Sequence, residues 1–199
     1  MDPLYLEIGT LAVCMVLSAF FSGSESALFS LKDMLRYILG EESWTTVGEE
    51  LAFVGRYCEL QRLRFQERLS VSIRCAEEAA AVRIPKLILQ PMVENAVIHG
   101  IEPLDRTGRL EVEARREENG HGGAAAGCGC TLITVADDGA GFSPGSGDAV
   151  ERIGLANVRE RLMAACPGAR MTIESSPGAG TRIALEIPET RGDGEGPDR

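Results

Sequence analysis

Lysine is nearly absent from this 199-residue sequence, which contains only Lys32 and Lys86. Neither lysine follows a glycine, so the glycine loop and lysine that hold phosphates in Walker-type ATPases are missing. Acidic residues outnumber basic ones by 30 to 20, the net charge is -10, and no block of Lys and Arg could follow a phosphate backbone. The sequence therefore predicts no nucleic-acid partner, and a bound nucleotide would have to be held by other means.

Metal-ligating residues are also few. The chain has two histidines, His99 and His121, and six cysteines, none of which forms a CxxC pair. This pattern supports neither a zinc site nor a disulfide framework. We interpret the cysteines as reduced thiols of a cytosolic domain.

Only one stretch is apolar over a length close to that of a bilayer. Residues 4–21 contain a single charged residue, Glu7, which lies near one end, and as a helix they would extend about 27 Å. The first basic residues follow the stretch, which would leave the rest of the chain in the cytoplasm. We predict a membrane anchor within residues 4–28, and a buried or interfacial helix is the alternative.

The segment at residues 17–28, Leu-Ser-Ala-Phe-Phe-Ser-Gly-Ser-Glu-Ser-Ala-Leu, resembles the first membrane helix of the cyclin-M/CorC-type membrane domain. The resemblance covers only about thirty residues, and no other segment is apolar enough over about 20 residues to supply the further spans of such a domain. We infer no transport function from it. Residues 1–32 are at most an anchor, or a fusion or artefact joined near Asp33.

An amphipathic helix is predicted at residues 49–65, where Leu51, Val54, Cys58 and Phe65 recur at helical spacing. Such an apolar stripe needs a partner. It can pack on its own domain or form half of a dimer bundle, and the sequence leaves both options open. We assign residues 33–68 to the remnant of a helical dimerisation region.

Apolar patterns predict five strands, at residues 69–75, 109–116, 131–136, 171–174 and 182–187. Hairpin-like strands interleaved with helices favour an α/β fold, specifically a two-layer α/β sandwich with a mixed sheet. We predict this domain at residues 69–189 and a disordered tail at residues 190–199.

Two helices are predicted between these strands. One covers residues 86–99, with a kink or a late start caused by Pro91. The other covers residues 155–165, and its buried face carries Leu155, Val158 and Leu162.

Two short motifs bring polar groups into this pattern. Glu94 and Asn95 lie side by side in an otherwise apolar helix, and an amide oxygen is a ligand that suits Mg²⁺. Asp137 ends a strand and is followed by Gly139 and Gly141, so its carboxylate can accept the adenine amine while the backbone approaches the base. Alone, the first motif could be a satisfied core amide and the second a plain turn.

A third motif, Ser-Pro-Gly-Ala-Gly-Thr at residues 176–181, is a glycine turn that can offer N–H groups and a hydroxyl to phosphate. In this order and spacing, the three motifs resemble the N box and glycine boxes of the GHKL, or Bergerat-fold, ATPases. Residues 87–100 and 153–162 resemble more specifically the LytS-type sensor histidine kinases. The match covers residues 33–188.

The resemblance implies a domain that binds ATP and Mg²⁺. It assigns Mg²⁺ to Asn95 and the adenine amine to Asp137, and it makes Glu94 and Asn95 the candidate catalytic residues. The segment 142–153 would be a mobile lid over ATP, with Arg152 where the second glycine box often begins with glycine. The remaining contacts with the base and the phosphates are assigned to Gly139, Gly141, Gly154, Leu155, Gly178, Gly180 and Thr181.

The resemblance also implies phosphoryl transfer in place of hydrolysis. ATP hydrolases of this superfamily use a glutamate four residues before the Mg²⁺ asparagine, and that position is Pro91 here. The kinases instead present the γ-phosphoryl group to an imidazole on another helix, with catalysis coming from positioning and charge neutralisation. The acceptor histidine expected shortly before residue 49 is missing, and neither His99 nor His121 is expected to replace it.

We therefore predict the ATP-binding catalytic domain of a two-component sensor histidine kinase. It would act as a homodimer, or with a complete kinase partner that supplies the histidine, and would serve a response regulator. Two alternatives stay open: a non-catalytic nucleotide-binding fragment, and a serine/threonine kinase of the anti-sigma-factor type. The helix at residues 49–65 and the phrase Gln90-Pro91 speak against the latter.

Overall fold

The computed structural model describes residue 32 and residues 34–40, 42–118, 129–143 and 149–188, without the side chains of residues 149–153. Two predictions lie outside this part of the chain: the membrane anchor, with its resemblance to a transport-associated domain, and the disordered tail; His121 also lies outside it. The central residues of the predicted lid, 144–148, also lie outside it. Within the described ranges, every helix is too short or too polar to cross a bilayer.

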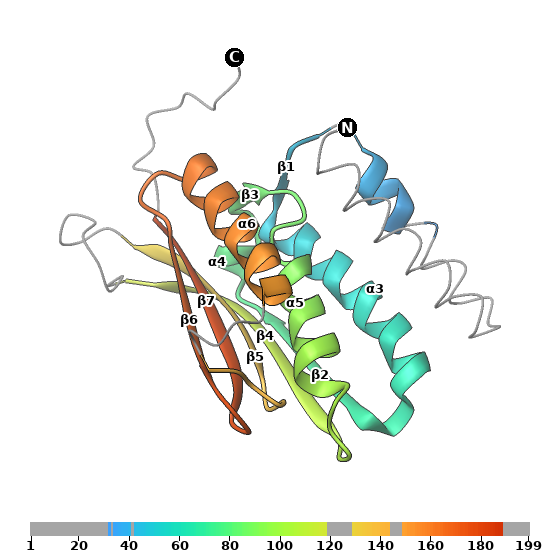
Figure 1. The fold of residues 1–199 in the computed structure, drawn as a ribbon. Coiled ribbons are helices and arrows are strands. Elements are labelled where there is room, and N and C mark those ends of the chain that lie inside the picture. The colour runs from blue at the N-terminus through green and yellow to red at the C-terminus, as the bar shows by residue number, and fades with distance from the viewer. Residues whose placement is uncertain (1–31, 33, 41, 119–128, 144–148, 189–199) are drawn as a thin grey trace.

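A five-stranded mixed sheet is the framework of the fold (Figure 1). β2 runs parallel to β4, and every other neighbouring pair is antiparallel. The five predicted strands are all confirmed, with ends that differ by at most two residues. In spatial order they are β2 (Leu69–Cys75), β4 (Gly108–Glu117), β5 (Cys130–Asp137), β7 (Gly180–Pro188) and β6 (Arg170–Ser176).

A row of β-branched side chains crosses the whole sheet on one face. The strand register aligns Ile73, Val112, Val135, Ile183 and Ile173 in that order. The three central members are at most 2% exposed, and burying each contributes about 1.5–3 kcal/mol. Because a slip of one residue would turn this row to the opposite face, the apolar pattern fixes the register of the strands.

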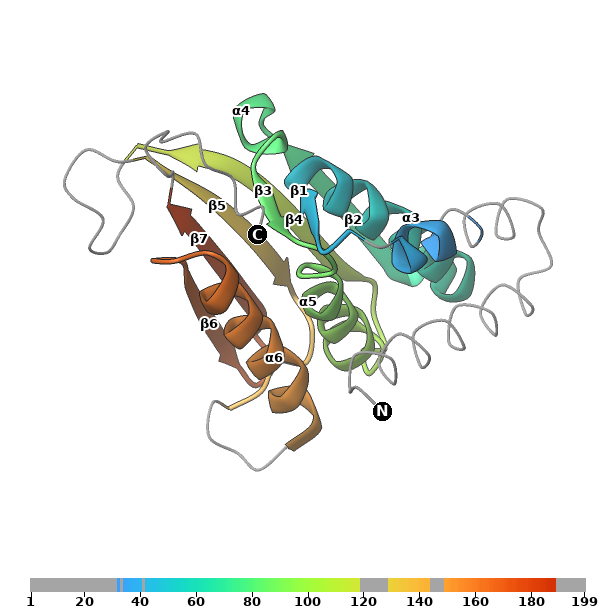
Figure 2. The ribbon, with the colours of Figure 1, turned by 90° about the horizontal axis from the view of Figure 1, so that it is seen from above.

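The helices form the second layer, over that same face of the sheet (Figures 1 and 2). This arrangement confirms the predicted two-layer α/β sandwich. A small two-stranded sheet, β1 with β3, lies beside the helices. The layer consists of α3 (Val47–Phe65), α5 (Gln90–Asn95), the π-helix η2 (Ala96–Ile101) and α6 (Ala149–Ala165), and the shorter elements are β1 (Trp44–Thr46), η1 (Gln66–Arg68), α4 (Glu77–Ala80) and β3 (Arg83–Pro85).

α3 packs against its own domain. A capping box between Thr46 and Glu49 starts the helix, and its predicted apolar stripe is buried. The buried residues of α3 belong to a single core cluster, whose members range along the sequence from Met34 to Ile187. The apolar stripe of α3 therefore packs on its own domain, which is the first of the two options that the sequence left open. The boundary at residue 68 between a helical region and the ATP-binding domain stays a prediction.

The two remaining predicted helices differ from the structure mainly at their starts. α5 begins at Gln90 with Pro91 in its first turn, which confirms the late start. α6 begins at Ala149, six residues before the predicted position, so Gly154 lies inside the helix. A glycine inside a helix costs only about 1 kcal/mol relative to alanine, which does not stop a helix with a buried face.

Candidate functional site

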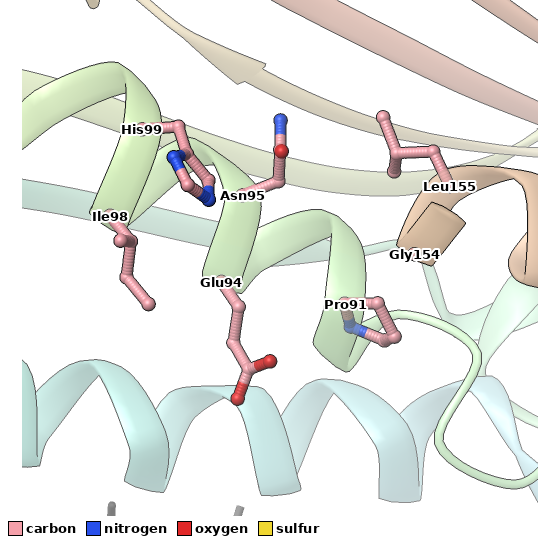
Figure 3. Close-up of a pocket in the computed structure, with 7 residues that line it drawn as sticks. All are labelled: Pro91, Glu94, Asn95, Ile98, His99, Gly154 and Leu155. Carbon is pink, nitrogen blue, oxygen red and sulfur yellow. The ribbon is translucent and has the colours of Figure 1, made fainter. Parts of the chain in front are cut away.

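A cleft of about 110 Å³ opens between α5–η2 and the first turns of α6 (Figure 3). It brings together four of the sequence-predicted site residues, Glu94, Asn95, Gly154 and Leu155, from segments about sixty positions apart. The full lining comprises Pro91, Glu94, Asn95, Ile98, His99, Gly154 and Leu155.

The two polar residues of the first motif point in different directions. Figure 3 shows the Glu94 side chain leaving the helix on the opposite side from the Asn95 amide. Glu94 is also held in place, because the Gln90 side-chain amide donates a 3.0 Å hydrogen bond to its Oε1 atom. The α5 side of the cleft therefore contributes an oriented carboxylate and a carboxamide that point in different directions.

Directly after Asn95 the helix widens into the π-helix η2. The Glu102 N–H donates to the Val97 carbonyl, five residues back, at 2.9 Å. Short π segments occur frequently at functional sites. Here the widened turn ends against the carboxyl end of β5, because the Gly100 carbonyl accepts a 2.8 Å hydrogen bond from the Ala140 N–H.

Asp137 lies at this strand end, beside Gly100. The Gly139 N–H donates to its Oδ1 atom at 2.8 Å, and the Thr181 N–H donates to the same carboxylate. Burial raises its pKa to about 6, against the pull of these two donors. A half-buried carboxylate held only by backbone amides in the described contacts has acceptor capacity left for a ligand.

Asp138, the next residue, is occupied differently. Its carboxylate accepts from the Arg109 N–H at 2.7 Å and from the Arg106 guanidinium at 3.0 Å. The Arg109 side chain adds a second cation at 3.5 Å. The two neighbouring aspartates therefore differ in their partners. The Asp138 carboxylate is paired with two arginine side chains, whereas the Asp137 carboxylate is bound by backbone N–H groups.

Gly139 is required by the close approach of two chain segments. A Cβ at this position would lie 2.3 Å from the Gly100 carbonyl carbon. The sequence pattern linked this glycine to the approach of a ligand, whereas the structure shows that the protein backbone itself occupies the space. Left-handed backbone, which favours glycine, occurs at Gly141, Gly178 and Gly180.

In the glycine turn of residues 176–181, one N–H group and the threonine hydroxyl form hydrogen bonds within the protein. The Gly178 N–H donates to the Ala140 carbonyl at 2.6 Å. The Thr181 hydroxyl lies 2.9 Å from the Ser175 hydroxyl. In this structure the turn thus supports the loop after β5 and presents neither of these groups outward.

Ser175 is a residue of the site that the sequence reasoning missed. Its hydroxyl accepts from the Phe142 N–H at 2.9 Å and donates to the Gly180 carbonyl at 3.1 Å. The strand register aligns it with Thr181 and Asp137. A serine directly before the turn carries no distinctive sequence signal, so only the pairing of β6 with β7 could identify it.

Two protein-family models match this chain. The model described as "Histidine kinase-, DNA gyrase B-, and HSP90-like ATPase" matches residues 80–191, which include both the cleft and the end of β5. The model described as "Histidine kinase" matches residues 15–69, which include α3.

Individual proteins agree with these matches. The chain is 35% identical over 149 residues to the sensor histidine kinase YesM of Bacillus subtilis, covering 72% of this chain and 24% of that protein. It is 31% identical over 184 residues to the sensor protein kinase HptS of Staphylococcus aureus, covering 85% of this chain and 33% of that protein. The chain thus spans about a quarter to a third of the length of these relatives.

A solved structure shows the same fold. The catalytic domain of the histidine kinase ThkA superposes with a TM-score of 0.52 at 15% identity, covering 75% of this chain and 97% of that one. At this level of identity the similarity extends to the arrangement of the sheet and its helices.

Proposed function

This chain belongs to the family of histidine kinase-, DNA gyrase B- and HSP90-like ATPases, and from that premise we propose that it is the ATP-binding catalytic domain of a two-component sensor histidine kinase. The observation that carries the proposal is the cleft that holds Asn95 and Gly154, with the Asp137 carboxylate at the neighbouring strand end. The phrases at residues 87–100 and 153–162 support the finer assignment to the LytS type.

The residues of the site fit Mg-ATP in their chemistry. A half-buried carboxylate with a raised pKa suits the adenine amine, and we assign it to Asp137. An amide oxygen at the cleft suits Mg²⁺, and we assign it to Asn95. A Cβ at Gly154 would meet no heavy atom within 4 Å, so this side of the cleft offers open space, which we assign to the phosphates.

The proposed reaction moves the γ-phosphoryl group to an imidazole nitrogen: a new P–N bond forms and the bond to the β-phosphate oxygen breaks. Mg²⁺ would neutralise charge on the phosphates. Asn95 and Gly154 would hold the triphosphate, and Asp137 would hold the base. Glu94 is the proposed acceptor of the proton that the imidazole releases, because Gln90 orients its carboxylate at the same cleft.

We propose that the acceptor histidine is supplied by another chain. The sequence between residues 15 and 69, which the "Histidine kinase" model matches, contains no histidine. We propose a homologous partner that carries the histidine, and a response regulator that receives the phosphoryl group from it. We expect the domain to act in the cytoplasm, anchored to the membrane through residues 4–28.

Kinase activity is testable by mixing the full chain with a complete family kinase that keeps its acceptor histidine but has a disabled ATP site. We expect label from γ-labelled Mg-ATP on the partner's histidine, and roughly 10- to 100-fold less with Asn95→Ala because Mg²⁺ loses a ligand. ATP binding without transfer would select the non-catalytic alternative. No ATP binding by the folded chain would refute the proposal.

Replacing Gly154 with alanine should separate nucleotide binding from folding. The added methyl group meets no protein atom, and alanine favours a helix over glycine by up to about 1 kcal/mol, so the thermal midpoint should hold or rise. In the cleft the same methyl group would occupy space assigned to the phosphates. We expect Mg-ATP affinity to fall at least about tenfold, because a small displacement of the bound groups is costly.

Calorimetry and thermal unfolding of the same samples measure both effects. The matched control is Gly55→Ala on α3, where the new Cβ would make an ordinary 3.7 Å contact with Ile73. It should gain helix stability and leave affinity unchanged. Unaltered ATP affinity in Gly154→Ala would remove this glycine from the phosphate site.

A further inference from the structure

The loop of residues 86–89 connects β3 to α5 and has an unusual backbone. Leu87 has a φ of 58°, a left-handed conformation that costs roughly 1–2 kcal/mol for a residue with a Cβ. Such a conformation persists where surrounding contacts determine it. Contacts of this kind reach the loop from two helices, α3 and α6.

From α3, the Glu50 carboxylate accepts the N–H groups of the loop. The Leu87 N–H donates to Oε1 at 2.6 Å and the Leu89 N–H donates to Oε2 at 3.1 Å. Glu50 is 0% exposed, although glutamate is almost never fully buried unless it is paired. A third donor, the Tyr37 hydroxyl, lies 2.5 Å from Oε1.

The hydrogen bonds of Glu50 and Tyr37 fit a carboxylate acceptor and a phenol that keeps its proton. Burial raises the pKa of Glu50 while its hydrogen-bond donors oppose the rise. Burial and the neighbouring Glu50 also raise the pKa of Tyr37, so the phenol keeps its proton and remains a donor. The acceptor-only carboxylate is thus matched by three donors, which an amide in its place could not satisfy.

From α6, Arg161 binds the carbonyl groups of the same loop. One guanidinium nitrogen donates to the Lys86 carbonyl at 2.6 Å, and the other donates to the Leu87 carbonyl at 3.4 Å. The planar guanidinium fork suits two neighbouring acceptors, whereas a lysine would reach only one of them. The loop is therefore held through its N–H groups by one helix and through its C=O groups by another.

We propose that Glu50 and Arg161 are positioning residues that hold the 86–89 loop from both sides and so set the spacing between Asn95 and Gly154. The loop leads directly into α5, which carries Asn95. Arg161 lies seven residues after Gly154, about 10 Å along the rigid helix α6. The inference rests on the proposed function, because it concerns where Mg²⁺ and the phosphates bind.

Calorimetry on the full chain tests the inference with ATP in the presence and in the absence of Mg²⁺. Arg161→Gln and Glu50→Gln should each weaken Mg-ATP binding by roughly tenfold or more, because small displacements of positioning groups are costly. The gain in affinity that Mg²⁺ provides should shrink in both, since none of the described hydrogen bonds joins Asp137, at the adenine end, to the loop. Arg159→Gln and Glu59→Gln, exposed residues on the same two helices, are matched controls and should behave like the wild type.

The double variant adds a second criterion. Because both residues act on one loop, Glu50→Gln with Arg161→Gln should bind no more weakly than the weaker single variant, and a multiplicative loss would contradict a shared loop. If Glu50→Gln fails to fold, Tyr37→Phe replaces it, since this change removes one donor from the carboxylate. Folded variants with wild-type affinity and wild-type Mg²⁺ dependence would overturn the inference. Absence of ATP binding by the wild-type chain would instead refute the proposed function.

Discussion

Replacing Asp137 with asparagine is expected to weaken Mg-ATP binding roughly 10- to 100-fold, the value of a hydrogen bond to a charged group. The carboxylate is the proposed acceptor of the adenine amine. Two backbone N–H groups, from Gly139 and Thr181, already hold it in place. An asparagine that keeps these bonds with its oxygen would turn its own NH₂ group toward the base, donor against donor.

The same substitution should have an opposite effect on stability, and this effect depends on pH. The pKa of Asp137 is raised by burial to about 6, from 3.8 without burial. The folded chain therefore binds this proton more tightly than the unfolded chain, so the stability contributed by the group is complete below about pH 4 and is lost as pH rises through about 6. Asparagine does not titrate. The stability of Asp137→Asn relative to wild type should thus increase between about pH 4 and pH 7, and stay constant above that.

Thermal unfolding and calorimetry at several pH values measure both effects. Wild-type affinity for Mg-ATP should fall below about pH 6 as Asp137 takes up a proton, while the affinity of the variant should follow only the titration of ATP itself. Asp138→Asn is the matched control: it should lower stability by weakening the contacts with Arg106 and Arg109 and change affinity little. Parallel pH profiles for the wild type and Asp137→Asn would exclude Asp137 from the binding site.

Replacing Gly139 with alanine should destabilise the fold by about 3 kcal/mol or more, the upper range for forced overpacking. The new Cβ would lie 2.3 Å from the carbonyl carbon of Gly100. Neither segment can retreat easily, because the Ala140 N–H bonds to the Gly100 carbonyl at 2.8 Å and the Gly139 N–H bonds to Asp137 at 2.8 Å.

Denaturation measurements would show the effect as a thermal midpoint lowered by roughly 6–12 °C. Gly154→Ala is again informative, because its Cβ meets open space and its stability should be retained. Nucleotide binding should weaken as well, since the same contact holds the π-helix against Asp137. A variant with an unchanged midpoint would mean that the loop after β5 yields easily, contrary to its hydrogen bonding.

Patterns with a fixed period predicted the framework of this fold. Alternating apolar residues located the strands at residues 69–75 and 109–116, and a continuous apolar run located the one at residues 131–136. The stripe through Leu155, Val158 and Leu162 located the buried face of α6. The start of α6 was placed too late because the glycine- and serine-rich residues 142–153 were interpreted as a lid. The low helix propensity of glycine does not by itself locate the start of a helix, since the packing of the helix outweighs the propensity of one residue.

The site was only partly predictable. The sequence pointed to Asp137 rather than Asp138 through a resemblance, and the structure adds a physical reason, because two arginines from distant positions surround Asp138. Glu50 and Arg161 gave no signal, since one looks like any charged residue of an amphipathic helix and the other like any exposed arginine. Their contacts with residues 86–89 depend on tertiary packing, which no spacing rule contains.

The hydrogen bonds from the 86–89 loop to Glu50 should slow hydrogen exchange in this loop. Loop amides usually exchange their hydrogens with solvent quickly, because local fluctuations expose them. The amides of Leu87 and Leu89 instead bond to a carboxylate that is 0% exposed, on a helix that belongs to the core. They should exchange as slowly as amides of the central strands, and deuterium uptake at these two positions would report directly on separation of α3 from the rest of the domain.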